Sequence, residues 1–284
     1  MIQDIREQIE IGNYGRALNR IDDLLWKEPE NAELRGLRGV VLIAQELNLE
    51  GIEDLGTSIA VADAAEFRYW RSVALFEEKE FDKSIEDAEK AVQLGSENYL
   101  YLHHLIALYQ NLGPVDKSMG IIDRVLAIEP GDIRSLMARA YVFIKRQEFD
   151  LAIEDYEEII KQDYYEEDIF NNLGYCYDRK QEYDKAQLYY DKALEINPYH
   201  QYALNNLGLI YCRRGGLREG KKMILKSIGY DPQNSYAYKN MGKAKLLQGL
   251  KEEALQYFLK SKELGYSEAY DAEVDDILAE DFNL

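Results

Sequence analysis

The chain has 284 residues, of which 46% are hydrophobic, 12% are aromatic and only 5 are proline. This composition excludes a chain that is disordered throughout and a collagen-like chain, and it favours helices around a substantial buried core. The net charge of −19 disfavours nucleic acid and anionic membrane surfaces as partners, unless a local basic patch is present.

In chain order, the sequence predicts a series of helix pairs followed by a tail. Residues 1–30 predict a truncated first unit, and residues 31–64 predict a degenerate unit that fits after a slip of one residue. Residues 65–268 predict six full units, and residues 269–284 predict an acidic capping helix or tail. Together we expect a single solenoid over residues 1–284, because one repeat covers nearly the whole chain.

The six full units are recognised by a repeat of 34 residues. The sequence Asn171-Asn172-Leu173-Gly174 recurs as Asn205-Asn206-Leu207-Gly208 and as Lys239-Asn240-Met241-Gly242. With residue 167 as position 1, small residues occupy positions 8 and 20 of most units, and larger residues occupy position 24. Small side chains allow two helices to approach closely, which predicts a tight contact within each pair.

Residues 167–200 show the pattern most clearly. We expect helices at 168–180 and 184–196, with a charged turn at 181–184 and Asp184 as the N-cap of the second helix. The unit resembles the tetratricopeptide repeat (TPR) in the following residues: Leu173, Gly174, Tyr177, Ala186, Tyr190, Ala193 and Pro198.

The resemblance implies an all-α fold, a right-handed superhelical solenoid of antiparallel helix pairs. It would have about eight TPR units plus a C-terminal capping helix. It also implies a protein–protein interaction scaffold whose concave groove binds an acidic or extended peptide segment of a partner. Because catalytic motifs are missing from the sequence, as described below, we expect this scaffold to be non-catalytic and to need no cofactor. In such a groove the first helix of each unit faces the ligand.

Charge is distributed unevenly along the chain. Residues 201–234 carry a net charge of +4 and residues 235–268 carry +2, whereas residues 1–98 carry −11 and the tail 269–284 carries −6. Two interpretations explain this uneven distribution. One is random variation of the charges on a solvated surface. The other, which we favour, is a local site for an anionic partner, because complementary charge guides association.

The family pattern places one set of residues in the groove around residues 167–268. Asparagine amides both donate and accept hydrogen bonds, cations bind carboxylates, and tyrosines offer rigid contact area. The predicted peptide-binding residues are Asn171, Asn172, Asn205, Asn206, Asn240, Lys239, Lys243, Arg179, Arg213, Tyr202 and Tyr236. The alternative is that these residues are inherited from the consensus of the repeat and bind no ligand. The chaperone-tail pattern of the family fits less well, since no three consecutive units carry its residues.

A second hypothesis is a self-assembling structural protein. The acidic tail, with Tyr270, Val274, Ile277, Leu278 and Phe282 on one helical face, would dock into the groove in cis or in a neighbouring molecule. A simple cap over the last unit is the plainer interpretation of the same pattern.

The sequence contains no motif that requires catalysis, a metal or a cofactor. Residues 215–222 resemble a phosphate-binding loop, but Lys222 replaces the required hydroxyl residue and a helix is expected before the loop. His103 and His104 are adjacent and point to different helix faces, and His200 is expected in a turn.

The remaining predictions concern the cellular compartment. The start of the chain lacks the basic and apolar regions of a signal peptide, and no apolar stretch approaches the roughly 20 residues of a membrane span. Cys176 and Cys212 lack metal or redox spacing and are expected to be buried, with a disulfide or a reactive thiol as the alternative. We therefore expect a cytoplasmic protein.

Overall fold

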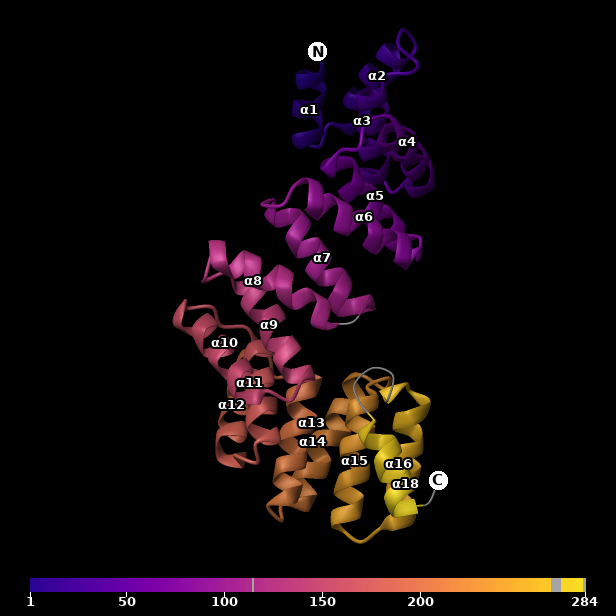
Figure 1. The fold of residues 1–284 in the computed structure, drawn as a ribbon. Coiled ribbons are helices and arrows are strands. Elements are labelled where there is room, and N and C mark those ends of the chain that lie inside the picture. Colours follow the sequence, from indigo (N-terminus) through magenta and orange to yellow (C-terminus); the bar gives the residue numbers. More distant parts are fainter. Residues whose placement is uncertain (114, 267–271, 283–284) are drawn as a thin grey trace. The chain divides into compact units, whose positions relative to one another are not determined.

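The computed structural model describes residues 1–113, 115–266 and 272–282, and this part of the chain contains helices and no strand (Figure 1). Contacts between Cα atoms divide the chain into two compact units, unit 1 at Met1–Val142 and unit 2 at Phe143–Leu284. The division falls inside helix α9 (Ile133–Lys145).

Unit 1 contains eight α-helices and one 3-10 helix before α9 in the residues described. They are α1 (Ile2–Glu10), α2 (Tyr14–Leu25), α3 (Ala32–Ala44), α4 (Asn48–Val61), α5 (Ala65–Glu77), α6 (Phe81–Leu94), α7 (Tyr99–Leu112), η1 (Val115–Ser118) and α8 (Met119–Ile128).

Unit 2 continues with the same kind of pairs and ends on a shorter helix. Its described helices after α9 are α10 (Phe149–Lys161), α11 (Glu167–Arg179), α12 (Tyr183–Ile196), α13 (Gln201–Arg213), α14 (Leu217–Tyr230), α15 (Ser235–Leu247), α16 (Lys251–Glu263) and α18 (Glu273–Phe282).

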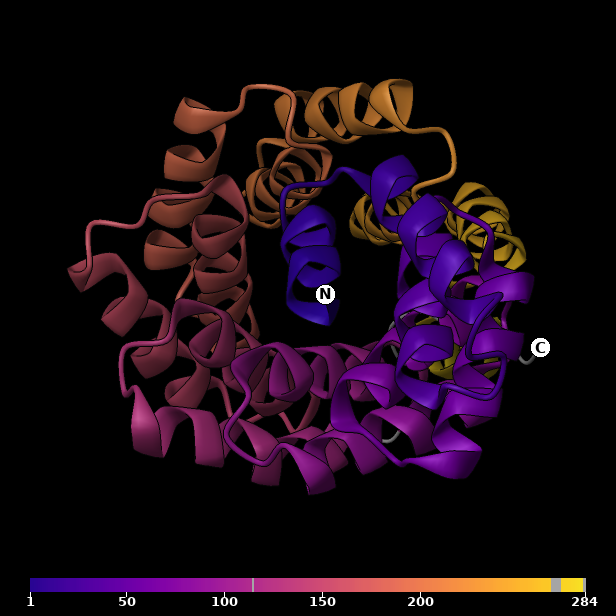
Figure 2. The same cartoon turned by 90° about the horizontal axis from the view of Figure 1, so that it is seen from above.

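The predicted fold class is confirmed. In the described sequence the helices follow one another as eight consecutive pairs before α18 (Figures 1 and 2). Turns of three residues connect the two members of each pair except α7/α8, where η1 lies between the helices. Within the units, the strongest packing is between the members of a pair, as in α3/α4, α5/α6, α11/α12, α13/α14 and α15/α16. The single solenoid over residues 1–284 and the boundaries of its repeat units stay predictions.

The small residues of the repeat lie where paired helices touch. A Cβ atom added to Gly174 would lie 2.6 Å from the ring of Tyr190, and one added to Gly242 would lie 2.7 Å from the ring of Phe258. At Gly208 the added atom would lie 2.6 Å from the carbonyl oxygen of Gly220. Glycine therefore sets the distance at which α11, α13 and α15 pack against their second helices.

The turn within a pair often requires a residue in the left-handed region. Gln181 has φ 62° and Gly215 has φ 89° at equivalent positions. After Gln181, the amide of Glu182 donates to the carbonyl of Tyr177 at 2.9 Å, and α12 begins at Tyr183 with Glu182 at the N-cap position. The prediction of Asp184 as the N-cap is therefore wrong, because the turn closes earlier. Asp184 instead pairs with Arg214.

The end of unit 2 is covered by α18. Val274 and Leu278 of α18 are buried in a cluster with Ala254, Phe258 and Tyr266, and Ile277 and Phe282 pack partly buried against the same cluster. Of the apolar face predicted for the tail, Tyr270 lies outside the described residues. The others give α16 an apolar neighbour, as the end of a solenoid requires.

Candidate functional site

The five asparagines of the predicted site form one continuous network, which we call the amide ladder: Asn171, Asn172, Asn205, Asn206 and Asn240. The Nδ2 atom of Asn240 donates to Oδ1 of Asn205 at 2.5 Å and to Oδ1 of Asn206 at 3.2 Å. Asn206 donates in turn to Asn171 at 3.5 Å, and Asn171 donates to Asn172 at 3.2 Å. The ladder therefore connects α11, α13 and α15, the first helices of three successive pairs.

Most of the amide ladder is buried. Asn205 is 0% exposed, Asn240 is 1% exposed and Asn206 is 5% exposed, whereas Asn172 is only half-buried. Buried amides need internal partners, and these residues find them in one another. In the structure the ladder thus has a packing role, and its role as a ligand for a peptide stays a prediction.

The four predicted cations, which we call the cation cluster, come from the same three helices: Arg179, Lys239, Lys243 and Arg213. The Nζ atom of Lys239 donates to Oε2 of Glu273 at 2.8 Å and to the hydroxyl of Tyr266 at 2.9 Å. Lys243 binds the other oxygen of the same carboxylate. Glu273 is the first residue of α18, so one carboxylate of the tail bridges two lysines of α15.

The two arginines lie nearer the surface. The Nη1 atom of Arg213 donates to Oδ1 of Asp178 at 2.5 Å, and the Arg213 side chain is 29% exposed. Arg179 is exposed, donates to the hydroxyl of Tyr175 at 3.2 Å and lies 5.9 Å from that ring. Burial lowers the pKa of Arg179, but interactions with Tyr175 and Glu273 outweigh it and raise the pKa above its ordinary value.

Electrostatics shows that these groups act on one another. Burial, followed by repulsion from Lys239, lowers the pKa of Lys243 to about 8, and Arg213 acts in the same direction. Burial alone would raise the pKa of Glu273, but the charges of Lys239 and Lys243 and their hydrogen bonds hold that pKa well below its ordinary value. The cation cluster therefore already holds two carboxylates, that of Glu273 on its lysines and that of Asp178 on Arg213.

The two predicted tyrosines have different surroundings. The ring of Tyr236 lies under the ammonium of Lys239, which is 3.8 Å from its centroid, so Tyr236 belongs with the cation cluster. Tyr202 is half-buried, and its ring contacts His200 at 6.2 Å between centroids. His200 is the N-cap of α13, and its Nδ1 atom accepts from the amide of Ala203 at 3.1 Å.

Sequence reasoning missed Glu273, Tyr266 and Tyr175 as members of this site. A signal for Glu273 existed, since it stands 34 residues after Lys239 and continues the series Asn171, Asn205, Lys239 at position 5. Extending the repeat register into the tail would have placed its carboxylate beside α15. Tyr266 stands one repeat length after Pro232, and prolines at this position end a helix, so the pattern gave no signal for a hydroxyl group there.

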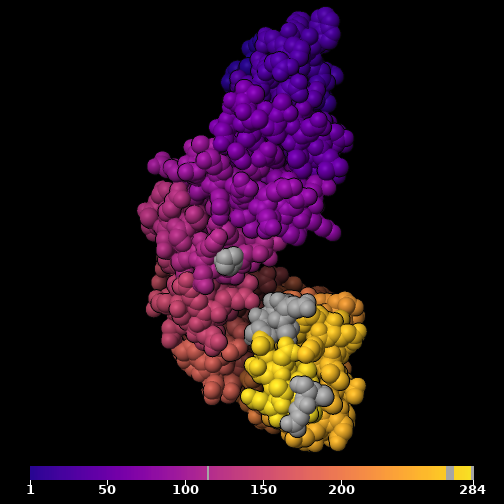
Figure 3. All heavy atoms as spheres, turned by 45° about the vertical axis from the view of Figure 1, so that its right-hand side comes forward, coloured from indigo at the N-terminus to yellow at the C-terminus, as the bar shows by residue number. Residues whose placement is uncertain are grey.

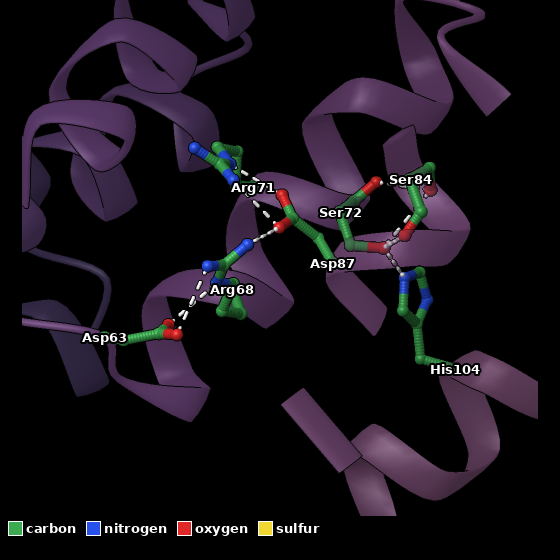
Figure 4. Close-up of polar contacts among 7 residues, drawn as sticks. All are labelled: Asp63, Arg68, Arg71, Ser72, Ser84, Asp87 and His104. Atoms are coloured by element: carbon green, nitrogen blue, oxygen red, sulfur yellow. Dashed lines mark hydrogen bonds and ion pairs between the residues drawn. The ribbon is translucent and has the colours of Figure 1, made fainter. Parts of the chain in front are cut away.

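Unit 1 contains a second polar network, at the contact of α5 and α6 (Figure 4). The carboxylate of Asp87 accepts from Arg71 at 2.6 and 2.8 Å and from Arg68 at 2.6 Å. Arg68 also donates to Asp63 at 2.7 Å, and this hydrogen bond lowers the pKa of Asp63. An arginine in the first helix and an aspartate in the second are also joined in α3 and α4, where Arg38 binds Asp54 at 2.5 and 2.8 Å.

A separate group of hydrogen bonds joins a serine of α5 to a histidine of α7, at Ser72 and His104 (Figure 4). The Nε2 atom of His104 lies 2.8 Å from the hydroxyl of Ser72, and burial lowers the pKa of His104 to about 4. Ser72 is 0% exposed, and its hydroxyl donates to the carbonyl of Ser84 at 2.7 Å. This donation leaves the imidazole as the donor to Ser72, which suits helix packing rather than proton abstraction from the hydroxyl.

Three further findings concern metals, thiols and membranes. Among the described residues, no group of three or more His, Cys, Asp or Glu side chains could hold a metal ion. Cys176 and Cys212 are free and buried, and burial raises the pKa of Cys176 to about 12. Within the described ranges, no helix is long and apolar enough to cross a membrane.

Comparison with known proteins identifies the repeat. Three models of the tetratricopeptide repeat match residues 50–99, 167–200 and 189–222. The chain is 28% identical over 98 residues to the BBSome complex member BBS4 of Bos taurus, and this match spans 34% of the chain and 19% of that relative.

Among solved structures, a tetratricopeptide repeat protein from Parabacteroides merdae aligns with a TM-score of 0.72 at 17% identity, over 87% of this chain and 97% of that one. MamA from Desulfovibrio magneticus aligns with a TM-score of 0.54 at 16% identity, over 61% and 98%. Yeast Tom70 aligns with a TM-score of 0.53 at 18% identity, over 93% and 57%. These similarities concern the fold.

Proposed function

Since the chain is a tetratricopeptide repeat protein, we propose that it is a non-catalytic protein–protein interaction scaffold whose unit 2 binds an acidic, extended segment of a partner. Repeats of this family generally mediate protein–protein interactions. The proposed binding surface is the side of α11, α13 and α15 that carries the cation cluster. It includes the predicted residues Arg179, Arg213, Lys239, Lys243 and Tyr236, with Tyr175 beside them.

One observation supports this proposal above the others, namely the carboxylate of Glu273 bound by Lys239 and Lys243. This contact within the chain uses the same chemistry that we propose for a partner, a carboxylate bound by paired ammonium groups. Charge-assisted hydrogen bonds of this kind are about twice as strong as neutral ones. Arg179 and Arg213 are the more exposed cations, so they offer further carboxylates of the partner a place to bind.

The sequence predicts that the asparagines of the amide ladder bind the peptide themselves, whereas the structure supports an indirect contribution of most of them. Its hydrogen bonds hold α11, α13 and α15 in register, which fixes the spacing between the cations that these helices carry. The half-buried Asn172 is the ladder residue best placed to contact a peptide, while Asn205 and Asn240 act through the spacing of the helices.

We test the proposal with a short fluorescein-labelled peptide of alternating glutamate and alanine and a matched peptide of glutamine and alanine. Fluorescence anisotropy should show that the wild-type chain binds the glutamate peptide more tightly. Replacing Arg179 and Arg213 together by Gln should weaken that binding about tenfold. Binding should also weaken as NaCl rises from about 50 to about 500 mM, because screening shortens the reach of exposed charges.

The matched control is the double variant Arg218→Gln/Lys222→Gln. Both residues are exposed on α14, so this variant loses the same net charge from a helix outside the cation cluster. It should bind the glutamate peptide as the wild type does. Equal affinity for the two peptides, or equal losses in the two double variants, would reject the binding surface.

We propose further that the protein works in the cytoplasm. The two buried, unpaired cysteines suit a reducing compartment. Fractionation of cells that produce the native protein, followed by immunoblotting, tests this proposal, and recovery in an oxidising compartment would contradict it.

A further inference from the structure

Helix α18 is held on unit 2 by few buried residues. It has 10 residues, and of these only Val274 and Leu278 are fully buried, whereas α13 buries nine of its thirteen residues. Figure 3 shows it, in yellow, at the surface of the molecule. A helix of this length has little stability of its own, so its attachment depends on the contacts with its seat. We define the seat as Lys239, Lys243, Ala254, Phe258 and Tyr266.

The lysines of the seat require an anionic partner. The side chain of Lys239 is only 4% exposed, and its ammonium lies between the carboxylate of Glu273, the hydroxyl of Tyr266 and the ring of Tyr236. A buried ammonium that loses its anion is strongly destabilising. A segment that replaces α18 must therefore bring a carboxylate of its own to Lys239 and Lys243.

The remainder of the seat demands apolar side chains at fixed spacing. Val274 follows Glu273 directly, and Leu278 and Phe282 follow at steps of four residues along the same helical face. The ring of Phe282 lies 6.2 Å from that of Phe258. The outward side of α18 is acidic, with Asp276, Glu280 and Asp281 exposed.

From these contacts we infer that the seat is an exchangeable binding surface for an acidic amphipathic helix of a partner protein. This helix would begin with a glutamate, followed by apolar residues one, five and nine positions later. The inference rests on the proposed function, and it specifies the partner segment that the lysine end of the cation cluster accepts. Helix α18 is then the internal occupant, which the partner helix displaces.

The test uses the full chain and a labelled peptide with the sequence of residues 272–282. The variant Glu273→Gln weakens the hold of α18 on its seat, so it should bind this peptide about tenfold more tightly than the wild type does. The matched control Asp276→Asn removes the same charge from the exposed side of α18 and should bind like the wild type. A peptide with glutamine at the position of Glu273 should bind the Glu273→Gln chain about tenfold more weakly than the unmodified peptide.

The outcomes are separable. Equal peptide affinity of the Glu273→Gln and Asp276→Asn chains, or equal affinity of the two peptides for Glu273→Gln, would overturn the inference. A doubled mass of Glu273→Gln in light scattering without peptide would assign the seat to a second copy of the chain and would also overturn it. Circular dichroism melting curves establish that both variants fold.

The glutamate–alanine peptide provides the link to the proposed function. If it still binds while the helix peptide fails to bind, only the present inference is wrong. If neither the wild type nor Glu273→Gln prefers it over the glutamine peptide, the proposed function itself fails.

Discussion

The pairs α5/α6 in unit 1 and α13/α14 in unit 2 make the same helix contact with opposite chemistry. In α5/α6, the close approach is made by Ser72 and Ser84, beside the buried ion pair of Arg71 with Asp87. In α13/α14 it is made by Gly208 and Gly220, with no side chain between the backbones.

The difference shows where each of the two pairs keeps its charged groups. The α5/α6 pair places charges inside the helix contact, where each has a partner of opposite charge. The α13/α14 contact is made by glycines, and the cations of α11, α13 and α15 gather in the cation cluster. Removing one partner of a buried ion pair strongly destabilises a fold, because the other charge is left uncompensated. Cations that repel one another, as Lys239 and Lys243 do, need an anion to relieve the repulsion, and a partner can supply it.

The largest expected effect follows from breaking the internal ion pair of unit 1. Asp87→Ala should destabilise the chain by about 3 kcal/mol, because it removes the carboxylate that pairs with the partly buried guanidinium of Arg71 and leaves Arg68 with Asp63 as its anion. Urea unfolding followed by circular dichroism measures this loss. The control Glu86→Ala removes an exposed acid from the same helix and should change stability by less than about 0.5 kcal/mol. Similar losses in the two variants would remove the distinction between the two helix pairs.

A smaller effect is expected at the glycine contact of unit 2. In Gly220→Ala the new methyl group would lie 2.3 Å from the carbonyl oxygen of Gly208 and 2.9 Å from the backbone nitrogen of Cys212, so the two helices must separate. The cost should be about 1–3 kcal/mol.

Gly229 of the same helix provides the control. No atom lies within 4 Å of an added Cβ there, so Gly229→Ala should stabilise by about 0.5–1 kcal/mol. If both alanines stabilise α14, the tight contact is not what sets the spacing of the pair.

The smallest effect concerns the pH dependence of the cation cluster. The pKa of Lys243 is lowered to about 8 in the folded chain and is about 10.4 in an unfolded one, so the folded chain releases this proton first. The free energy of unfolding should therefore rise by about 1 kcal/mol between about pH 7 and about pH 9. The gain starts near the folded value and is complete above the unfolded one.

Lys243→Met should lack this rise while keeping the rest of the pH profile. Urea unfolding of both chains at the two pH values gives the comparison. A parallel rise in both chains would show that Lys243 carries no unfavourable charge at neutral pH.

The fold could be predicted well from the sequence because the repeat is read from residue size. Gly174, Ala186 and Tyr190 define the contact of α11 with α12, and side-chain volume is visible in a sequence. The turns were harder. Gln181 adopts a left-handed conformation that glycine adopts at Gly215, so its residue type gave no signal and the start of α12 was placed too late.

The candidate site could be predicted only in part, because periodicity gives the face of a helix and not the depth of a side chain. Asn206 and Asn240 lie on the predicted helices, yet their amides form hydrogen bonds with other asparagines of the amide ladder. Whether a periodic asparagine meets a ligand or its neighbour depends on the distance between successive helices, which the small residues and tertiary packing determine. The partnership of Lys239 with Glu273 could not be assigned from the sequence, because the net charge and the apolar face of the tail do not say which of its carboxylates meets the lysine.

The position of Glu273, one repeat length after Lys239, also limits how the array can be extended. An amide donates and accepts, so one asparagine-bearing unit can follow another, whereas an ammonium only donates. An additional consensus unit grafted after α16 would put an asparagine where the carboxylate now lies and would enclose an uncompensated positive charge. A longer version of this protein would therefore need a new anion beside Lys239. Good helix propensity and apolar packing of the added unit would not supply it.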